Sequence, residues 1–275
     1  MIQWTSPSAR DWVVFPRVGV LPWRPFLPGL ADVPRSPYAP AVSRWATGRL
    51  VRAVRAGDWA RATTAVGERA DPDVGLTARV AGQAGKVTAP VLFWALAAGA
   101  GGLVQALLLA GASVTHRLAV TPDRGQALGQ TALDWVTREA DLLALLRAGL
   151  GQFTACGNDA RDSVLHIAAS HGWLEAARFV VERTGMVEVR NGFGQTPLHA
   201  VVRAPRLPRE RLYLRRMIDY LVEAGAPLEA RDEVGDTPLA TAMTHAPQLV
   251  RALLKAGADL TALAEPARQA ALALS

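Results

Sequence analysis

Short apolar runs that end in glycine recur along this chain and alternate with polar stretches. Residues 107–112 read Leu-Leu-Leu-Ala-Gly-Ala, and residues 142–149 read Leu-Leu-Ala-Leu-Leu-Arg-Ala-Gly. Alanine and leucine dominate these runs, and both residue types favour helix. The glycine that closes each run is free to adopt the positive φ that ends a helix and reverses the chain. The pattern predicts a series of short helices joined by tight turns.

One phrase repeats in the second half of the chain. It begins at Ser163 (Ser-Val-Leu-His-Ile-Ala), at Thr196 (Thr-Pro-Leu-His-Ala-Val) and at Thr237 (Thr-Pro-Leu-Ala-Thr-Ala). The first two starts are 33 residues apart and the next two are 41 apart. A period in this range indicates stacked structural units that share one surface. The longer spacing leaves about eight extra residues (41 minus 33) in the fifth unit, near 204–212, where two prolines predict a loop.

The phrase resembles the signature of the ankyrin repeat, Thr-Pro-Leu-His-x-Ala. The match is clear over residues 158–260 and degenerate over residues 44–150. The resemblance implies an all-α fold, an ankyrin-type helical repeat solenoid of about six helix-turn-helix units. Residues 44–275 would form this solenoid, with a capping first unit and a C-terminal capping helix after Pro266.

The resemblance also implies roles for the residues that recur in each unit. Thr196 and Thr237 are expected to cap the first helix of a unit. A proline follows each of them, and it is tolerated at the first helical position because the backbone N–H that it lacks would have no partner within the helix. His166 and His199 match a histidine whose imidazole, in the family, ties adjacent turns together.

Three units depart from this pattern. Phe93, Asp134 and Ala240 stand where the histidine would fall, so these units must tie their turns differently. Trp94 and Trp135 occupy a position that the family fills with apolar framework residues, and we expect both in the core.

Residues 1–43 differ in composition from the rest and predict an extended N-terminal arm. Eight of the eighteen prolines lie here, which excludes regular helix. The arm also contains Trp4, Trp12 and Trp23, so it is too apolar for a solvated tail. We expect these rings to pack on the repeats of the same chain. The alternative is an arm that inserts into a partner.

Between Lys86 and Arg117 the chain contains no Lys, Arg, Asp or Glu. Such a segment is long enough to cross a bilayer. However, its centre at 98–102 reads Ala-Gly-Ala-Gly-Gly, which also fits two helices joined by a glycine turn inside a buried repeat. We expect the buried repeat and no membrane association.

Composition and motifs favour a soluble, non-catalytic protein. The net charge is +6, but 28 of the 30 basic residues are Arg (30 minus two Lys), which indicates codon bias and weakens an inference of nucleic-acid binding. Cys156 is the only cysteine, so neither an intrachain disulfide nor a thiolate metal cluster can form, as is typical of the cytoplasm. His166 and His171 are spaced like metal ligands, yet no second pair lies near them in sequence. We expect no enzyme activity, no cofactor and no metal.

In the family, turn tips and first helices form a concave face that binds a protein partner. The corresponding residues here are Asp159, Asp162, Ser170, His171, Trp173, Phe193, Gln195, Arg203, Glu233, Val234, Asp236, Thr244 and His245. Phe193 is the most informative, because an aromatic side chain at an exposed turn tip is typical of an interface anchor. For Phe193 and Trp173, packing on the neighbouring unit is the alternative to partner contact.

Arginines also gather at the insertion in the fifth unit. They are Arg206, Arg209, Arg211, Arg215 and Arg216. We interpret them as a solvated helix flank. The alternative function is binding of a polyanion or nucleic acid through this patch and the basic arm, and its affinity would fall steeply with added salt.

We expect deletion of residues 1–43 to lower the melting temperature and the solubility of the protein, because apolar surface of the repeats would lose its cover. Thermal unfolding of the full and the shortened chain followed by circular dichroism tests this. An unchanged melting temperature together with unchanged solubility would show that the arm does not pack on its own chain.

Overall fold

The computed structural model of the chain describes residues 42–79, 86–116, 118, 130–150, 161–203, 211–263 and 268–271. The arm before residue 42 lies outside these ranges. So do Cys156, Asp159, Arg206 and Arg209, and so does the side chain of Arg211. The described residues divide into two compact units, one before residue 114 and one that contains the later helices.

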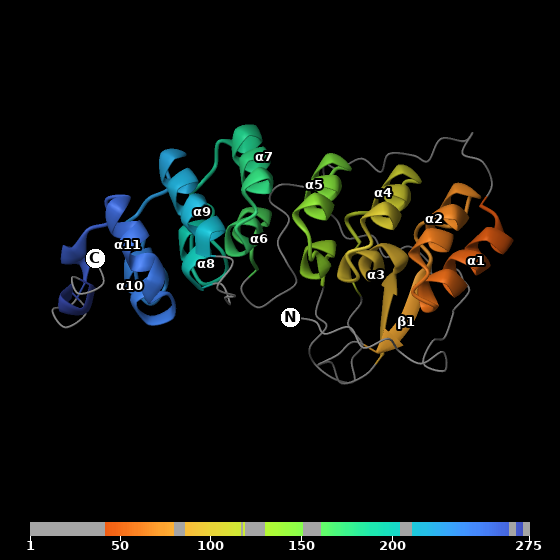
Figure 1. The fold of residues 1–275 in the computed structure, drawn as a ribbon, viewed down its shortest axis with the longest axis horizontal. Helices are drawn as coiled ribbons and strands as arrows, with labels where there is room; N and C mark the ends of the chain where they lie inside the picture. Colours follow the sequence, from red (N-terminus) through yellow and green to blue (C-terminus); the bar gives the residue numbers. More distant parts are fainter. Residues whose placement is uncertain are drawn as a thin grey trace, which may run out of the picture. The chain divides into compact units, whose positions relative to one another are not determined.

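The first unit contains two helix pairs and a β-hairpin (Figure 1). Its elements are α1 (Arg44–Arg55), α2 (Trp59–Gly67), β1 (Gly75–Arg79), β2 (Lys86–Pro90), α3 (Val91–Ala97) and α4 (Gly101–Leu109). Helix α1 packs on α2, α2 packs on α4, and α3 packs on α4. The side chains of Ser43 and Asp58 cap α1 and α2 by accepting the backbone N–H of Ala46 and Arg61, at 3.2 and 3.0 Å.

The hairpin is an element that the repeat pattern did not predict. Strands β1 and β2 pair antiparallel from Gly75 opposite Pro90 to Arg79 opposite Lys86. The Trp94 indole N–H holds the base of the hairpin against α3, because it lies 3.3 Å from the carbonyl of Leu76 and 3.2 Å from that of Ala89. Trp94 is 3% exposed, as expected for a core residue.

The charge-free segment after Lys86 is divided between a strand and two short helices. Helix α3 has 7 residues and α4 has 9, and Gly99 reverses the chain between them with φ +63°. This is the helix, glycine turn, helix arrangement of a buried repeat. Within the described ranges, none of the helices combines the length and the hydropathy that a membrane crossing requires.

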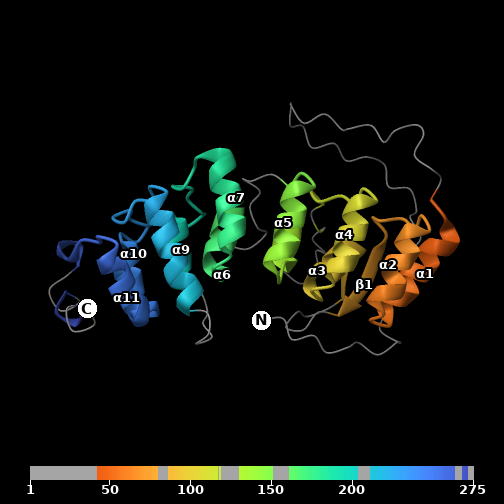
Figure 2. The ribbon, with the colours of Figure 1, turned by 45° about the horizontal axis from the view of Figure 1, so that its top comes forward.

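The second unit is a stack of helix pairs (Figures 1 and 2). Its elements are η1 (Ala132–Trp135), α5 (Glu139–Arg147), α6 (Val164–His171), α7 (Leu174–Thr184), α8 (Pro197–Arg203), α9 (Arg211–Glu223), α10 (Pro238–His245), α11 (Pro247–Lys255) and η3 (Leu260–Ala262). The first helices α6, α8 and α10 pack in one row, and the second helices α5, α7, α9 and α11 pack in another. Together with the two pairs of the first unit, the described elements form six successive pairs, the number that the sequence predicts.

Local sequence explains where the first helices begin. The Thr237 hydroxyl accepts the backbone N–H of Ala240 at 3.2 Å, and Pro238 follows at the first helical position. Ser163 and His166 form a capping box at the start of α6. Helix α6 ends at Gly172, which has φ +69°.

Equivalent positions of successive repeats fill the core. Leu165, Leu198 and Leu239 each stand two residues after the start of the repeated phrase, and all three are 0% exposed. Burial of such a side chain contributes about 1.5–3 kcal/mol. Residues 268–271 add a helical turn after the last pair, and Ala271 is buried.

We expect Gly172→Ala to lower the free energy of unfolding more than Gly185→Ala. Both glycines end helices with nearly the same φ, +69° and +66°, so alanine costs about 1–2 kcal/mol of backbone strain at either position. Only at Gly172 would the new Cβ meet a neighbour, since Tyr213 Cβ lies 3.0 Å away, whereas nothing lies within 4 Å at Gly185. Urea unfolding of both variants measures the difference, and equal losses would contradict the close approach of α9 to this turn.

Candidate interaction surface

Two turns of the second unit have the same internal geometry. In the turn at 190–195, Asn191 Oδ1 accepts the backbone N–H of Phe193 and of Gln195, both at 3.0 Å. In the turn at 231–236, 41 residues later, Asp232 Oδ1 accepts the backbone N–H of Val234 and of Asp236, both at 3.0 Å. Both side chains therefore hold their turns in one conformation.

The two turns are also bonded to each other. The backbone N–H of Glu233 donates to the carbonyl of Phe193 at 3.1 Å. The guanidinium of Arg190 donates to the carbonyls of Gly194 and Arg231, both at 2.7 Å. A Cβ on Gly194 would lie 3.2 Å from the backbone nitrogen of Glu233, so this close approach requires glycine. The turns form a continuous bonded row.

Buried imidazoles attach this row to the helices below it. Thr196 donates its backbone N–H to His199 Nδ1 at 3.1 Å, so the proton of the neutral ring is on Nε2, which donates to the carbonyl of Asp236 at 3.0 Å. His166 repeats the arrangement, with Ser163 N–H at 3.3 Å from Nδ1 and the carbonyl of Gln195 at 2.8 Å from Nε2. Both nitrogens of each ring are engaged, as the structural role implied by the sequence requires.

Burial sets the charge of these two histidines. It lowers the pKa of His166 and of His199 below the ordinary value near 6.5, although the hydrogen bonds to the carbonyls of Gln195 and Asp236 oppose the shift. The rings are therefore neutral at neutral pH. Over the described part of the chain, no three His, Cys, Asp or Glu side chains are grouped as a metal site would need.

A repeat without the histidine uses another side chain at the same place. Asp134 Oδ2 accepts the backbone N–H and the hydroxyl of Thr131, at 2.7 and 3.1 Å, and so caps its own short helix. Trp135 follows it and is 3% exposed, in the core as expected.

Apolar side chains are exposed at the tips of the bonded turns. Phe193 is 44% exposed and Val234, at the equivalent position of the next turn, is 81% exposed. Glu233 and Asp236 beside them are also exposed. We call Phe193, Glu233, Val234 and Asp236 the turn-tip surface.

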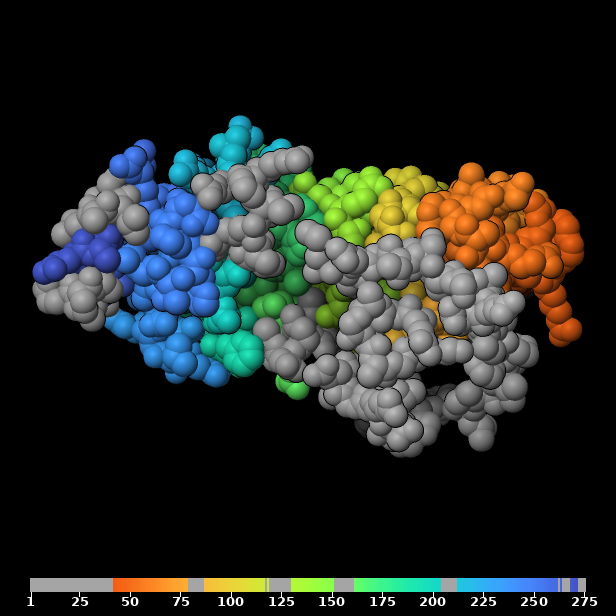
Figure 3. Space-filling view, turned by 60° about the horizontal axis from the view of Figure 1, so that its bottom comes forward, coloured from red at the N-terminus to blue at the C-terminus, as the bar shows by residue number. Residues whose placement is uncertain are grey.

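The other candidates lie away from the turn tips. Helix α8 starts next to a turn and ends at Arg203, and its 7 residues extend over about 10 Å. The candidates at the far ends of the first helices are Ser170, His171, Trp173, Arg203, Thr244 and His245. Figure 3 shows the repeats of this unit as adjoining bands from green to blue. The candidate list is therefore divided between two ends of the helix pairs.

Two predicted contact residues take part in the turn network instead. Gln195 is only 5% exposed, and its amide lies 3.4 Å from both Asn191 Nδ2 and Asp232 Oδ2. The expectation of an exposed Gln195 is wrong, because the side chain bridges consecutive turns. Asp162 is half-buried and accepts the Asn191 amide N–H at 2.8 Å.

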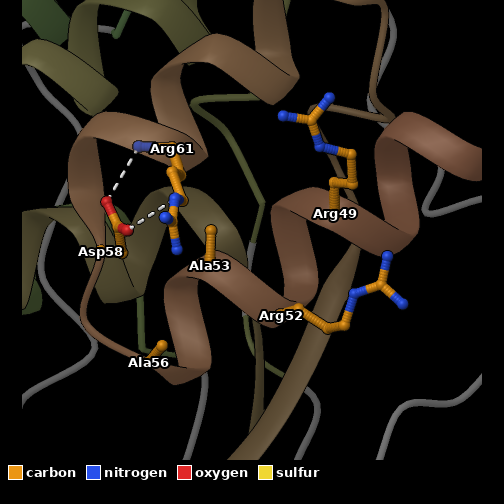
Figure 4. Close-up of a pocket in the computed structure, with 6 residues that line it drawn as sticks. All are labelled: Arg49, Arg52, Ala53, Ala56, Asp58 and Arg61. Atoms are coloured by element: carbon orange, nitrogen blue, oxygen red, sulfur yellow. Dashed lines mark hydrogen bonds and ion pairs between the residues drawn. The ribbon is translucent and has the colours of Figure 1, made fainter.

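An arginine-lined hollow of about 470 Å³ lies on helices α1 and α2 of the first unit (Figure 4). Its lining residues are Arg49, Arg52, Ala53, Ala56, Asp58 and Arg61. Arg61 pairs with Asp58 at 3.2 Å, and Arg49 pairs with Glu68 at 2.7 Å. Two of the three guanidinium groups are thus already balanced by carboxylates, which leaves a weak site for an anion.

One buried carboxyl group has a shifted pKa. Asp141 in α5 is 2% exposed, and burial raises its pKa while nearby Arg138 opposes the shift. Its Oδ2 has no hydrogen-bond partner among the residues that the structure describes.

Known structures share this arrangement of repeats. No family model and no curated protein matches the sequence. The ankyrin repeat protein EF0377 is 17% identical, with a TM-score of 0.54 over 76% of this chain and 96% of its own. The ankyrin repeat domain of Bcl-3, a member of the IκB family, is 21% identical, with a TM-score of 0.55 over 82% of this chain and 97% of its own. This chain has the ankyrin-repeat fold.

A third match comes from a protein complex. A chain in the complex of the predatory endopeptidase Bd0816 from Bdellovibrio bacteriovorus with immunity protein Bd3460 is 22% identical to this one. The TM-score is 0.52, over 78% of this chain and 99% of that chain.

The ankyrin-repeat signature in the sequence did not reveal the role of two arginines. Arg190 and Arg231 precede their turns at the same repeat position and donate to the carbonyls of Gly194 and Gly235 at 2.7 and 2.8 Å. Their recurrence at the 41-residue spacing is the signal that could have identified them as turn residues.

We expect the free energy of unfolding to fall between pH 7.5 and pH 5.5, and to fall less in His199→Asn. The folded pKa of His199 lies below the value of about 6.5 expected in the unfolded chain. Below about pH 6.5 the unfolded state therefore binds more protons than the folded state. The stability that is present above this pH is lost as the pH falls further, down to the lowered pKa of the folded state. Asparagine does not titrate in this range.

Urea unfolding at a series of pH values measures both slopes. The variant should also be less stable at pH 7.5, by about 1–3 kcal/mol, because the hydrogen bond from the buried ring to the carbonyl of Asp236 is lost. Equal pH dependence in the two proteins would show that His199 is not held neutral by the fold.

Proposed function

We propose that this protein is a non-catalytic interaction module that binds a protein partner through the turn-tip surface and the adjoining first helices of the second unit. The observation that carries the proposal is the row of bonded turns that presents Phe193 and Val234 at equivalent positions. We also propose that it acts in the cytoplasm, in keeping with its single cysteine.

The physical basis is preorganisation. The turns bond to each other and to the buried imidazoles, so little conformational entropy remains to be lost on binding. An exposed aromatic side chain on a rigid support is typical of residues that dominate binding energy. The charged side chains of Glu233 and Asp236 would form the polar rim around the apolar centre.

The known structures give further support for a protein partner. One similar chain is part of a complex between an endopeptidase and an immunity protein. The repeated units of such folds hold variable surface residues on a constant framework, so different chains can bind different partners.

Binding of a polyanion is a second candidate function. Arg203, Arg215 and Arg216 are exposed, and they flank the insertion in the fifth unit. This function would require contacts with several phosphates and a strong dependence on salt.

We expect the double variant Phe193→Ser, Val234→Ser to weaken partner binding by at least about tenfold, which corresponds to about 1.4 kcal/mol. The partner would first be captured from the native host with the full chain, identified, purified and titrated against each variant by calorimetry. Met186→Ser is the matched control, because Met186 is an exposed apolar residue of the same unit (50% exposed) outside the turn tips.

Unchanged affinity in the double variant, or an equal loss in the control, would contradict the turn-tip surface. A partner that proves to be nucleic acid, with an affinity that falls steeply as salt rises, would favour the second candidate function instead.

A further inference from the structure

The α6–α7 turn and the start of α9 meet at the end of the helix pairs away from the turn tips. A Cβ placed on Gly172 would lie 3.0 Å from Tyr213 Cβ and 3.3 Å from the Tyr213 carbonyl carbon. On either side of Gly172, the rings of His171 and Trp173 stack with their centroids 4.3 Å apart and their planes at 23°. Two aromatic rings and a tyrosine side chain are therefore gathered around one glycine.

The exposed apolar area here does not belong to the core of the repeat. The core side of α9 consists of Leu214, Met217, Ile218 and Leu221, which are between 0 and 1% exposed. Leu212 and Tyr213 lie outside that side and are 57% and 56% exposed. Two adjacent large side chains that remain this exposed are typical of a contact surface.

Two exposed arginines, Arg215 and Arg216, lie beside these apolar side chains. Arg215 and Arg216 are exposed near the beginning of α9, and the first turn of this helix contains no acidic residue. Neither side chain makes a hydrogen bond or an ion pair within the described ranges of the chain.

We propose that His171, Trp173, Leu212, Tyr213, Arg215 and Arg216 form a second docking surface, the hairpin-end surface, for an acidic protein segment that carries an aromatic or aliphatic anchor. The anchor packs against Tyr213 and the His171–Trp173 stack, and the acidic side chains pair with the two arginines. This inference rests on the proposed function in that the partner is a protein, but it uses residues that the turn-tip surface does not share.

Charge distribution favours a peptide over a nucleic acid. Glu175, in the first turn of α7, is exposed, and so is Asp219, one helical turn after the two arginines on α9. A phosphate backbone carries negative charge along its whole length and would approach these carboxylates. A peptide has acidic side chains at some positions only, so it can place them on Arg215 and Arg216 and place its apolar anchor elsewhere.

The test is a selection of random short peptides displayed on phage against the full chain, with the triple variant Tyr213→Ser, Arg215→Glu, Arg216→Glu as a parallel target. Serine keeps the Cβ that contacts Gly172 and removes the exposed ring. The matched control is Arg44→Glu, Arg52→Glu, which makes the same change of charge at exposed positions of helix α1. Circular dichroism would check that all three targets are folded.

We expect the peptides enriched on the full chain to combine Asp or Glu with Trp, Phe or Leu. Synthetic copies should bind the triple variant at least about tenfold more weakly than the full chain, and the control with less than about a threefold change. They should also bind Phe193→Ser, Val234→Ser as tightly as the full chain, so this result is separable from the test of the turn-tip surface.

Absence of enrichment, enriched peptides without net negative charge, or equal binding to the triple variant would overturn the proposal. Tighter binding of a single-stranded oligonucleotide than of any selected peptide, lost in the triple variant, would overturn the choice of a protein segment as occupant.

Discussion

The hydrogen bond from a buried imidazole to the carbonyl of the next turn fixes how one repeat of the second unit lies on the next. His199 accepts at one nitrogen from its own helix start and donates with the other to Asp236 of the following turn. One ring therefore joins a helix cap to the adjacent turn. Because the ring is buried and neutral, its nitrogens would be costly to leave unpaired.

This constraint determines which side chains reach solvent. The Glu233 N–H donates to the Phe193 carbonyl, and the Gln195 side chain bridges the two turns. The side chains at the tips lie outside these contacts and stay partly exposed. Phe193 and Val234 are exposed as a consequence of the framework. At the other end of the pairs, Gly172 has the same effect, since its missing Cβ lets α9 approach and leaves Leu212 and Tyr213 outside the core.

The parts of the fold that were predicted from sequence depend on local chemistry. Ser163, Thr196 and Thr237 open the same phrase, and a Ser or Thr at this position, followed by Pro in two of the three cases, favours the start of a helix, so the starts of α6, α8 and α10 could be placed. The hairpin at β1 and β2 could not, because its pairing rests on Thr77 opposite Thr88 and on the distant Trp94 indole. Gln195 was misplaced for a similar reason. Its burial depends on Asp232, 37 residues away.

The first helices of the second unit connect the two proposed surfaces. Residues between the two ends of these helices are small or half-buried, as Ala200, Ala240 and Ile167 are. Helix α8 extends over about 10 Å, a distance that about three residues of extended chain cover. A single partner segment could therefore cross the first helices and contact both surfaces. Two such contacts on one segment would raise affinity through effective concentration, without any additional contact in either surface.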